Sequence, residues 1–199
     1  MFKGIQKVSL VDYPGVIAAT LFTGGCNFNC SWCHNRSLVE PEQLSIQQEI
    51  PENVIQEYLL RRTGKIQGVC ITGGEPTLWG SKLEEFLRWC KANRLLVKLD
   101  TNGYLPDVLN NWLQENLLDF VAMDIKNVPE SYGDTVQVSG ININSILQSI
   151  EIIRNSSIPH LFRTTVVPGL VQPDQIRGFY HSKKLNYVLQ EYRDNSVHR

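Results

Sequence analysis

Three cysteines near the start of this sequence are the residues best suited to chemistry. Cys26, Cys30 and Cys33 form a CxxxCxxC pattern. A disulfide would use two sulfurs and leave the third unexplained. Structural zinc takes four ligands, and His34 could be the fourth, although adjacent residues seldom reach one tetrahedral ion. Iron–sulfur clusters are also held by thiolates, and three ligands would leave one iron open for chemistry. The spacing therefore favours a cluster with an open iron, with zinc as the alternative.

The composition is that of a globular protein of ordinary size. With 199 residues, of which 42% are hydrophobic and 20% charged, the sequence predicts a single domain over residues 1–199. The formal net charge is −1 and there is no basic run, so nothing supports binding to nucleic acid or to a membrane surface. No stretch has the apolar length of a signal peptide or of a membrane span, which needs roughly 20 residues. We therefore expect a cytoplasmic protein, and in that reducing compartment clustered cysteines more often bind metal or catalyse than form disulfides.

The elements that would position the cysteines are short apolar runs that alternate with amphipathic helical segments. We predict six strands, at residues 16–22, 69–72, 95–99, 120–125, 161–167 and 185–189. Helices are predicted between them, starting near Pro51, Ser81, Pro106, Asn144 and Pro173. Ser81 and Glu84 form a capping-box signature, and Asn144 is the expected cap of its helix. Residues 127–141 are expected to form a long loop.

This alternation predicts an α/β fold with a parallel sheet, because parallel neighbours need crossover helices. Right-handed crossovers curl such a sheet toward a barrel. Six units are fewer than the eight of a closed barrel, whose usual length is about 250 residues. We therefore predict a partial (β/α)6 barrel that is open on one side. A flat, doubly wound sheet remains possible from the pattern alone.

Polar and charged residues collect where the predicted strands end. In parallel α/β folds the carboxyl ends of the strands share one rim, where functional groups lie. The first strand leads into the cysteines, and the next four lead into Gly73, Gly74 and Glu75; Asp100 and Thr101; Asp124 and Lys126; and Arg163 and Thr165. Charged groups beside buried strands are costly unless they are paired or bound to something. Five such strand ends predict one shared site.

The pattern resembles the radical S-adenosylmethionine (radical SAM) family. The resemblance rests on the CxxxCxxC motif with Trp32 before the third cysteine, together with Gly-Gly-Glu-Pro at 73–76. Further segments resemble the glycyl-radical-enzyme activating enzymes, namely residues 12–15, 33–36, 100–103, 123–126 and 163–169. Within these, the sequence is most similar to the activating proteins of anaerobic ribonucleoside-triphosphate reductases, from about residue 4 to residue 192.

The resemblance implies one [4Fe–4S] cluster held by Cys26, Cys30 and Cys33, with S-adenosylmethionine (SAM) chelating the fourth iron. A reduced cluster would cleave SAM to a 5′-deoxyadenosyl radical, which would take a hydrogen atom from a glycine of a glycyl-radical enzyme. A flavodoxin- or ferredoxin-type protein is the implied electron donor. The cysteines and Lys126 are then the implied catalytic residues.

The resemblance also assigns cofactor contacts. Gly73 and Gly74 would let the backbone approach the methionyl ammonium, with the negative charge of Glu75 nearby. Trp32 would lie beside the adenine, and Asn35 would offer amide hydrogen bonds. The remaining implied contacts are Lys126, Arg163 and Thr165 around the carboxylate or ribose, and Asp100, Thr101 and Asp124 at positions that in some activating enzymes gather a monovalent cation.

Several residues carry weaker or opposing signals. Cys70 and Cys90 are expected to be structural, which leaves thiolates for one cluster only. His160, His181 and His198 have no partner at ligand spacing. Some activating enzymes place a histidine at the cofactor after the last strand, but residues 189–193 here contain none. The alternative functions are a radical SAM enzyme for a small molecule, such as a deazapurine-forming one, and a non-enzymatic metal-binding module.

Overall fold

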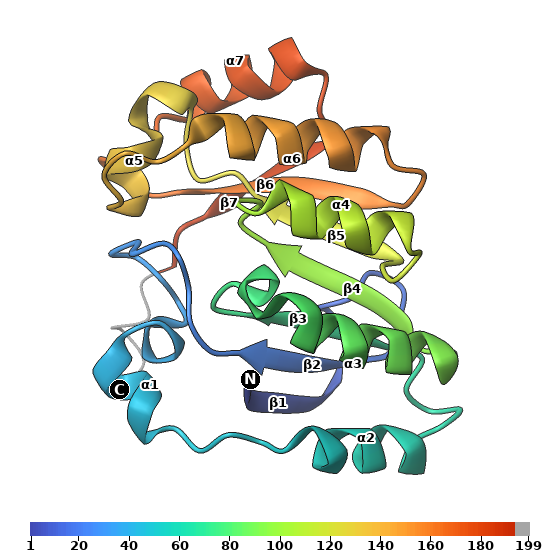
Figure 1. The fold of residues 1–199 in the computed structure, drawn as a ribbon. Coiled ribbons are helices and arrows are strands. Elements are labelled where there is room, and N and C mark those ends of the chain that lie inside the picture. Colours follow the sequence, from blue (N-terminus) through green and yellow to red (C-terminus); the bar gives the residue numbers. More distant parts are fainter. Residues whose placement is uncertain (194–199) are drawn as a thin grey trace.

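The computed structural model describes residues 1–193, and these contain one sheet of seven strands. The strands lie across the sheet in sequence order, from β1 to β7 (Figure 1). β1 is antiparallel to β2, and every later pair of neighbours is parallel. The strands are Phe2–Ser9 (β1), Ala18–Thr23 (β2), Gly68–Gly73 (β3), Leu96–Thr101 (β4), Phe120–Asp124 (β5), His160–Val166 (β6) and Tyr187–Glu191 (β7).

The strand order decides between the two predicted architectures. Crossovers between parallel strands are right-handed, so an order without reversal places the connecting helices on one face. A doubly wound sheet needs a reversal of strand order, and the order found in residues 1–193 has none. β1 and β7 are not paired with each other, so the sheet is not closed. The predicted partial barrel, open on one side, is confirmed.

β1 is an addition to the six predicted strands, which correspond to β2 to β7. It pairs only with β2, and residues 6–8 in its second half are exposed. Its sequence, Phe-Lys-Gly-Ile-Gln-Lys-Val-Ser, contains many polar residues, and an edge strand with an exposed side tolerates them. Because the prediction relied on apolar runs, this strand gave too weak a signal.

Helices cover the outer face of the sheet, and α3, α4 and α6 lie along it one after another (Figure 1). The longer helices are Glu52–Arg61 (α2), Gly80–Ala92 (α3), Pro106–Gln114 (α4), Ile143–Asn155 (α6) and Pro173–Lys183 (α7). The shorter ones are Arg36–Leu38 (η1), Pro41–Ile46 (α1), Pro76–Trp79 (η2), Pro129–Ser131 (η3) and Tyr132–Val136 (α5). Their apolar sides supply much of the core, with Phe86 and Trp112 at 0% exposure.

Alternation along each strand separates the core from the inner face. In β4, Val97 and Leu99 belong to the apolar core and are 0% exposed. Lys98 and Asp100, which alternate with them along the strand, point to the opposite face because successive strand side chains alternate. In β4 the inner positions are thus polar, whereas the outer positions are apolar.

Three details of the helix prediction are wrong. Ser81 is not a cap, because η2 runs directly into α3, which starts at Gly80. The cap of α6 is Asn142, whose side chain accepts a hydrogen bond from the backbone N–H of Asn144. Residues 127–141 contain η3 and α5 rather than loop alone.

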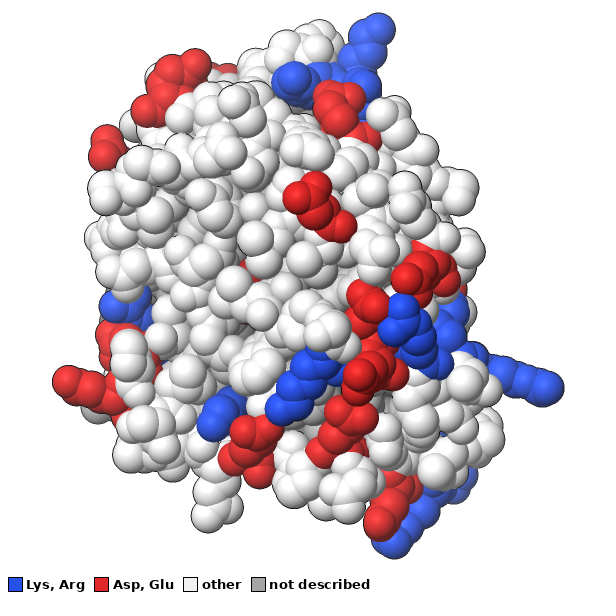
Figure 2. Space-filling view, in the orientation of Figure 1, with Lys and Arg blue, Asp and Glu red and all other residues white. Residues whose placement is uncertain are grey.

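The surface agrees with the balanced charge of the sequence. On the face shown in Figure 2, acidic and basic side chains lie beside one another rather than in patches of one sign. Among residues 1–193, none of the helices combines the length and the apolar character needed to cross a membrane.

Candidate functional site

The cysteine loop, residues 24–35, leaves the end of β2 and is anchored at both its base and its tip. The backbone N–H of Gly25 donates to the carbonyl oxygen of Leu38 at 2.7 Å. Toward the tip, the N–H of Asn29 donates to the carbonyl oxygen of Val136 in α5 at 2.9 Å. These hydrogen bonds hold the segment that carries the three cysteines against the rest of the rim.

Backbone contacts join this loop to the glycines that follow β3. The N–H of Glu75 donates to the carbonyl oxygen of Gly25 at 2.7 Å, and the Asn35 side chain donates to the carbonyl oxygen of Gly73 at 3.0 Å. Gly73 has φ +120°, a conformation that favours glycine. A Cβ atom on Gly74 would lie 1.9 Å from the Gly25 oxygen. Only glycine allows this approach, so the two sequence motifs meet as backbone against backbone.

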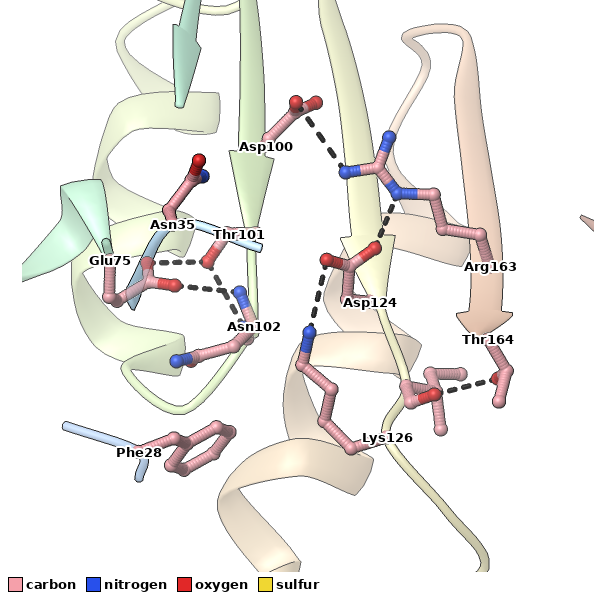
Figure 3. A network of polar contacts seen from close by, with 12 residues as sticks. Phe28, Asn35, Glu75, Asp100, Thr101, Asn102, Asp124, Lys126, Arg163 and Thr164 are labelled. Carbon is pink, nitrogen blue, oxygen red and sulfur yellow. Dashed lines mark hydrogen bonds and ion pairs between the residues drawn. The ribbon is translucent and has the colours of Figure 1, made fainter. Parts of the chain in front are cut away.

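Glu75 connects the loops after β3 and β4 (Figure 3). Its carboxylate accepts hydrogen bonds from the N–H and hydroxyl of Thr77 at 3.1 and 2.5 Å, from the Thr101 hydroxyl at 2.7 Å and from the Asn102 N–H at 2.7 Å. Glu75 is 1% exposed, and this burial raises its pKa even though the four hydrogen bonds oppose the shift. The carboxylate therefore organises the rim of the site through the chain's own donors.

A second group of charges joins β4, β5 and β6. The Arg163 guanidinium forms an ion pair with Asp124 and lies 3.5 Å from Asp100, and Lys126 donates to Asp124 at 3.1 Å (Figure 3). Burial alone would raise the pKa of Asp124, but the two cations outweigh it and lower the pKa below the usual range. The Lys126 ammonium also lies 5.3 Å from the centroid of the Trp32 ring. Both carboxylates are therefore paired with cations, and the lowered pKa keeps Asp124 ionised.

A cavity of about 250 Å³ opens between these loops and strand ends. Every site residue predicted from the sequence lines it, namely Cys26, Cys30, Trp32, Cys33, Asn35, Gly73, Gly74, Glu75, Asp100, Thr101, Asp124, Lys126, Arg163 and Thr165. Residues from the five predicted strand ends thus surround one cavity, as the parallel sheet predicts.

Six further residues line the cavity, namely Phe28, His34, Val39, Thr72, Asn102 and Gln190, and of these only His34 was considered from the sequence as a possible zinc ligand. Asn102 follows the predicted Asp100-Thr101 pair directly, but its sequence context also fits a simple turn. Its amide nitrogen lies 3.9 Å from the Cys26 sulfur and donates to the Asn27 side chain at 2.8 Å. Gln190 of β7 pairs in register with Thr165 of β6, within the segment that lacks the expected histidine.

The remaining histidines and cysteines differ in their positions. The His34 ring lies 6.0 Å from the ring of Tyr192, at the edge of the cavity. Cys70 and Cys90 are 0% exposed and do not line the cavity. His160 begins β6, at the end of the strand away from the rim, and His198 lies outside the described residues.

The donors in the cavity wall suit an iron–sulfur cluster and a polar ligand. All five cysteines are free thiols. Burial raises the pKa of Cys26 to about 12 and also raises that of Cys30, whereas the positive charge of Lys126 opposes both shifts. A metal would therefore have to displace these protons, as thiolate ligation requires.

The indole N–H of Trp32 is buried without a hydrogen-bond partner, so the wall offers a donor to a ligand. Within residues 1–193, no three Cys, His, Asp or Glu side chains are grouped as ligands of a single metal ion.

Comparison with known proteins decides the family. The model of the radical SAM superfamily matches residues 20–176. This chain belongs to the radical SAM superfamily. A candidate glycyl-radical enzyme activating enzyme of Methanocaldococcus jannaschii is 32% identical over 204 residues, which cover 100% of this radical SAM chain and 82% of the relative. The pyruvate formate-lyase 1-activating enzyme of Escherichia coli K12 is 26% identical over 175 residues, covering 85% of this chain and 68% of the relative.

Among solved structures, a histidine-tagged form of anSMEcpe with bound AdoMet has the same fold, with a TM-score of 0.67. It is 19% identical, and the match covers 86% of this chain and 50% of that chain. The family of this radical SAM enzyme follows from the relative that is 32% identical, which places the chain among the glycyl-radical-enzyme activating enzymes. Membership of the radical SAM superfamily implies a [4Fe–4S] cluster and SAM, and the thiols and polar groups that line the cavity suit both.

Proposed function

We propose that this chain generates a glycyl radical on a partner enzyme, an anaerobic ribonucleoside-triphosphate reductase, using SAM and one [4Fe–4S] cluster. The observation that carries the proposal is the cavity, where the three cysteines and the polar ends of four further strands share one wall. When bound there, the two cofactors supply reductive cleavage of a carbon–sulfur bond and removal of a hydrogen atom from glycine. A flavodoxin- or ferredoxin-type protein is the proposed electron donor.

The chain's own residues have distinct tasks in this proposal. Cys26, Cys30 and Cys33 hold the cluster, and Lys126 supplies a positive charge that favours the thiolate forms of Cys26 and Cys30. Lys126 is 16% exposed at its side chain, so its charge acts in a region largely shielded from water. A fourth cysteine does not line the cavity within the described residues, which leaves one iron for SAM.

SAM would bind across the loops that the backbone contacts hold together. Gly73 and Gly74 allow its ammonium to approach the main chain, and Asn35 keeps the cysteine loop beside them through its hydrogen bond to Gly73. Trp32 offers its unpartnered N–H and an apolar ring face to the adenosyl group. Arg163 retains guanidinium donors beyond those used for the aspartates, and these suit a carboxylate.

The far side of the cavity would be completed by Thr165 and Gln190. They are in register on β6 and β7, and both line the cavity. We propose that Gln190 takes the place of the late histidine, because its amide can both donate and accept hydrogen bonds. The partner's glycine would enter from the open side of the sheet, beyond β7.

The test uses anaerobically reconstituted protein, a chemical reductant and SAM. Wild type should form 5′-deoxyadenosine, and Cys30→Ala should not. Cys90→Ala is the control, because Cys90 is also a buried thiol but lies outside the cavity, and this variant should retain activity. If wild type forms no more 5′-deoxyadenosine than Cys30→Ala, the radical enzyme assignment is wrong for this chain.

The partner is identified by electron paramagnetic resonance. A glycine-centred doublet should appear on an anaerobic ribonucleoside-triphosphate reductase from the same cell and be absent with Cys30→Ala. A doublet only on another glycyl-radical enzyme would replace the partner and keep the activity. Cleavage of SAM without a doublet on any glycyl-radical protein would favour a small-molecule substrate.

A further inference from the structure

The two aspartates of the rim have no carboxylate oxygen left without a cationic partner. In Asp100, one oxygen pairs with the Lys98 ammonium and the other lies 3.5 Å from the Arg163 guanidinium. In Asp124, one oxygen pairs with Arg163 and the other with Lys126 at 3.1 Å. The five side chains form a single row in which positive and negative groups alternate, and Figure 3 shows Arg163 between the two carboxylates.

This row already carries more positive than negative charge. It contains two lysines and one arginine against two aspartates, and its cations are largely buried, with side-chain exposures of 5% for Lys98, 19% for Arg163 and 16% for Lys126. A further cation between the aspartates would face these positive groups at short range and with little screening by water. An anion, such as the carboxylate of SAM, would instead complete the charge balance.

Lys98 adds a buried positive charge beside Asp100. It lies on the inner face of β4, in register with Cys70 of β3 and Phe120 of β5. Its ammonium contacts the Cys70 sulfur at 3.5 Å in addition to Asp100. Lys98 does not line the cavity, so it reaches Asp100 from the interior of the sheet rather than from the ligand side. A lysine this deeply buried keeps its partner, because an unpaired buried ammonium is very costly.

We propose that the Lys98 ammonium and the Arg163 guanidinium take the place of an exchangeable monovalent cation between Asp100 and Asp124. SAM then binds to this chain without any requirement for Na⁺ or K⁺. The positions that resemble a cation site are thus occupied by the chain's own charges, and Lys98 is a positioning residue that fixes the Asp100 carboxylate. The inference rests on the proposed function in so far as SAM is the ligand.

The first experiment measures SAM affinity on reconstituted protein by equilibrium dialysis under argon. The buffers contain KCl, NaCl or tetramethylammonium chloride at equal ionic strength, because the tetramethylammonium ion is too large to enter a site between two carboxylates. Wild type should show the same Kd within about twofold in all three salts. Lys98→Met should bind at least about tenfold more weakly in tetramethylammonium than in KCl. A wild-type Kd that rises tenfold without K⁺ and Na⁺ would overturn the proposal.

Two variants keep this comparison interpretable. Lys91→Met is the matched control, because Lys91 also forms an ion pair with an aspartate, Asp119, but lies outside the cavity. Its SAM affinity should not depend on the salt. Lys98→Arg retains the buried positive charge and should behave as wild type, which covers the case in which Lys98→Met does not fold. Salt dependence in Lys98→Arg equal to that of Lys98→Met would refute the role of the charge.

A second measurement does not involve SAM. Titration of cluster-free protein with Na⁺, followed by the line width of the sodium-23 resonance, should show no saturable binding to wild type and saturable binding to Lys98→Met. Saturable binding to wild type that Asp100→Asn abolishes would overturn the inference. Absence of SAM binding in every salt would instead count against the proposed function, and the sodium titration would still decide the question of the cation.

Discussion

Replacement of Gly74 by alanine tests whether the contact between the two loops positions the site. The added Cβ would lie 1.9 Å from the carbonyl oxygen of Gly25 and 2.6 Å from its carbonyl carbon, whereas real Cβ contacts are essentially never under 3.0 Å. One of the two loops must therefore move by at least about 1 Å. Gly74 does not have a positive φ, so alanine suits its backbone and the clash is the only penalty.

The expected effects follow from that displacement. Overpacking against a fixed neighbour typically costs about 1–3 kcal/mol of unfolding free energy. For a chain of this size, that corresponds to a decrease of roughly 2–12 °C in Tm. A shift of about 1 Å in a binding site can reduce activity about 100-fold. Gly74→Ala should thus bind SAM much more weakly and form little 5′-deoxyadenosine, with only a moderate loss of stability.

Thermal unfolding and SAM dialysis on the same samples check both parts. Gly178→Ala in α7 is the control, because no atom lies within 4 Å of a Cβ at that position and alanine favours a helix. This control should keep full SAM affinity and be stabilised by up to about 1 kcal/mol. Wild-type Tm and SAM affinity in Gly74→Ala would show that the loops are not held together as described.

Two further predictions concern the acidic residues of the rim. Glu75→Ala removes a buried acceptor of four hydrogen bonds, so the unfolding free energy measured with denaturant should fall by about 2–4 kcal/mol. Glu75→Gln keeps one acceptor oxygen and should lose less. Equal losses of unfolding free energy in the two variants would contradict this. Because its ion pairs lower the pKa of Asp124 in the folded state, this residue contributes stability that is complete above its usual pKa of about 3.9 and is lost as the pH falls below that value. The unfolding free energy of wild type should therefore fall more steeply than that of Asp124→Asn as the solution is acidified through this range, and parallel pH profiles would refute the argument.

The sequence predicted the strand ends well because their chemistry is local. Cysteines, glycines and charged residues directly after apolar runs are visible without a structure, and the parallel sheet places them on one rim. The role of Glu75 was not visible in the same way, because its four hydrogen bonds come from Thr77, Thr101 and Asn102, two of which belong to another strand end. Gln190 was missed because glutamine on an exposed last strand has no special signal. Lys98 precedes Asp100 by two residues in the sequence, but only the structure shows that its ammonium contacts the Cys70 sulfur and that it lies outside the cavity.

The alternation within β4 has a consequence for how such a protein can change over time. Val97 and Leu99 pack against the helices, whereas Asp100 lines the cavity and Lys98 pairs with it from the inner face, so neighbouring positions are under different selection. A substitution at an inner position can alter ligand charge or ion requirement without disturbing the helical layer, and the reverse holds for the outer positions. A complete mutational scan of this strand should show tolerance for folding and tolerance for activity alternating from one residue to the next. The outer positions of this strand therefore determine packing and its inner positions determine the charge of the site, and the two can change nearly independently.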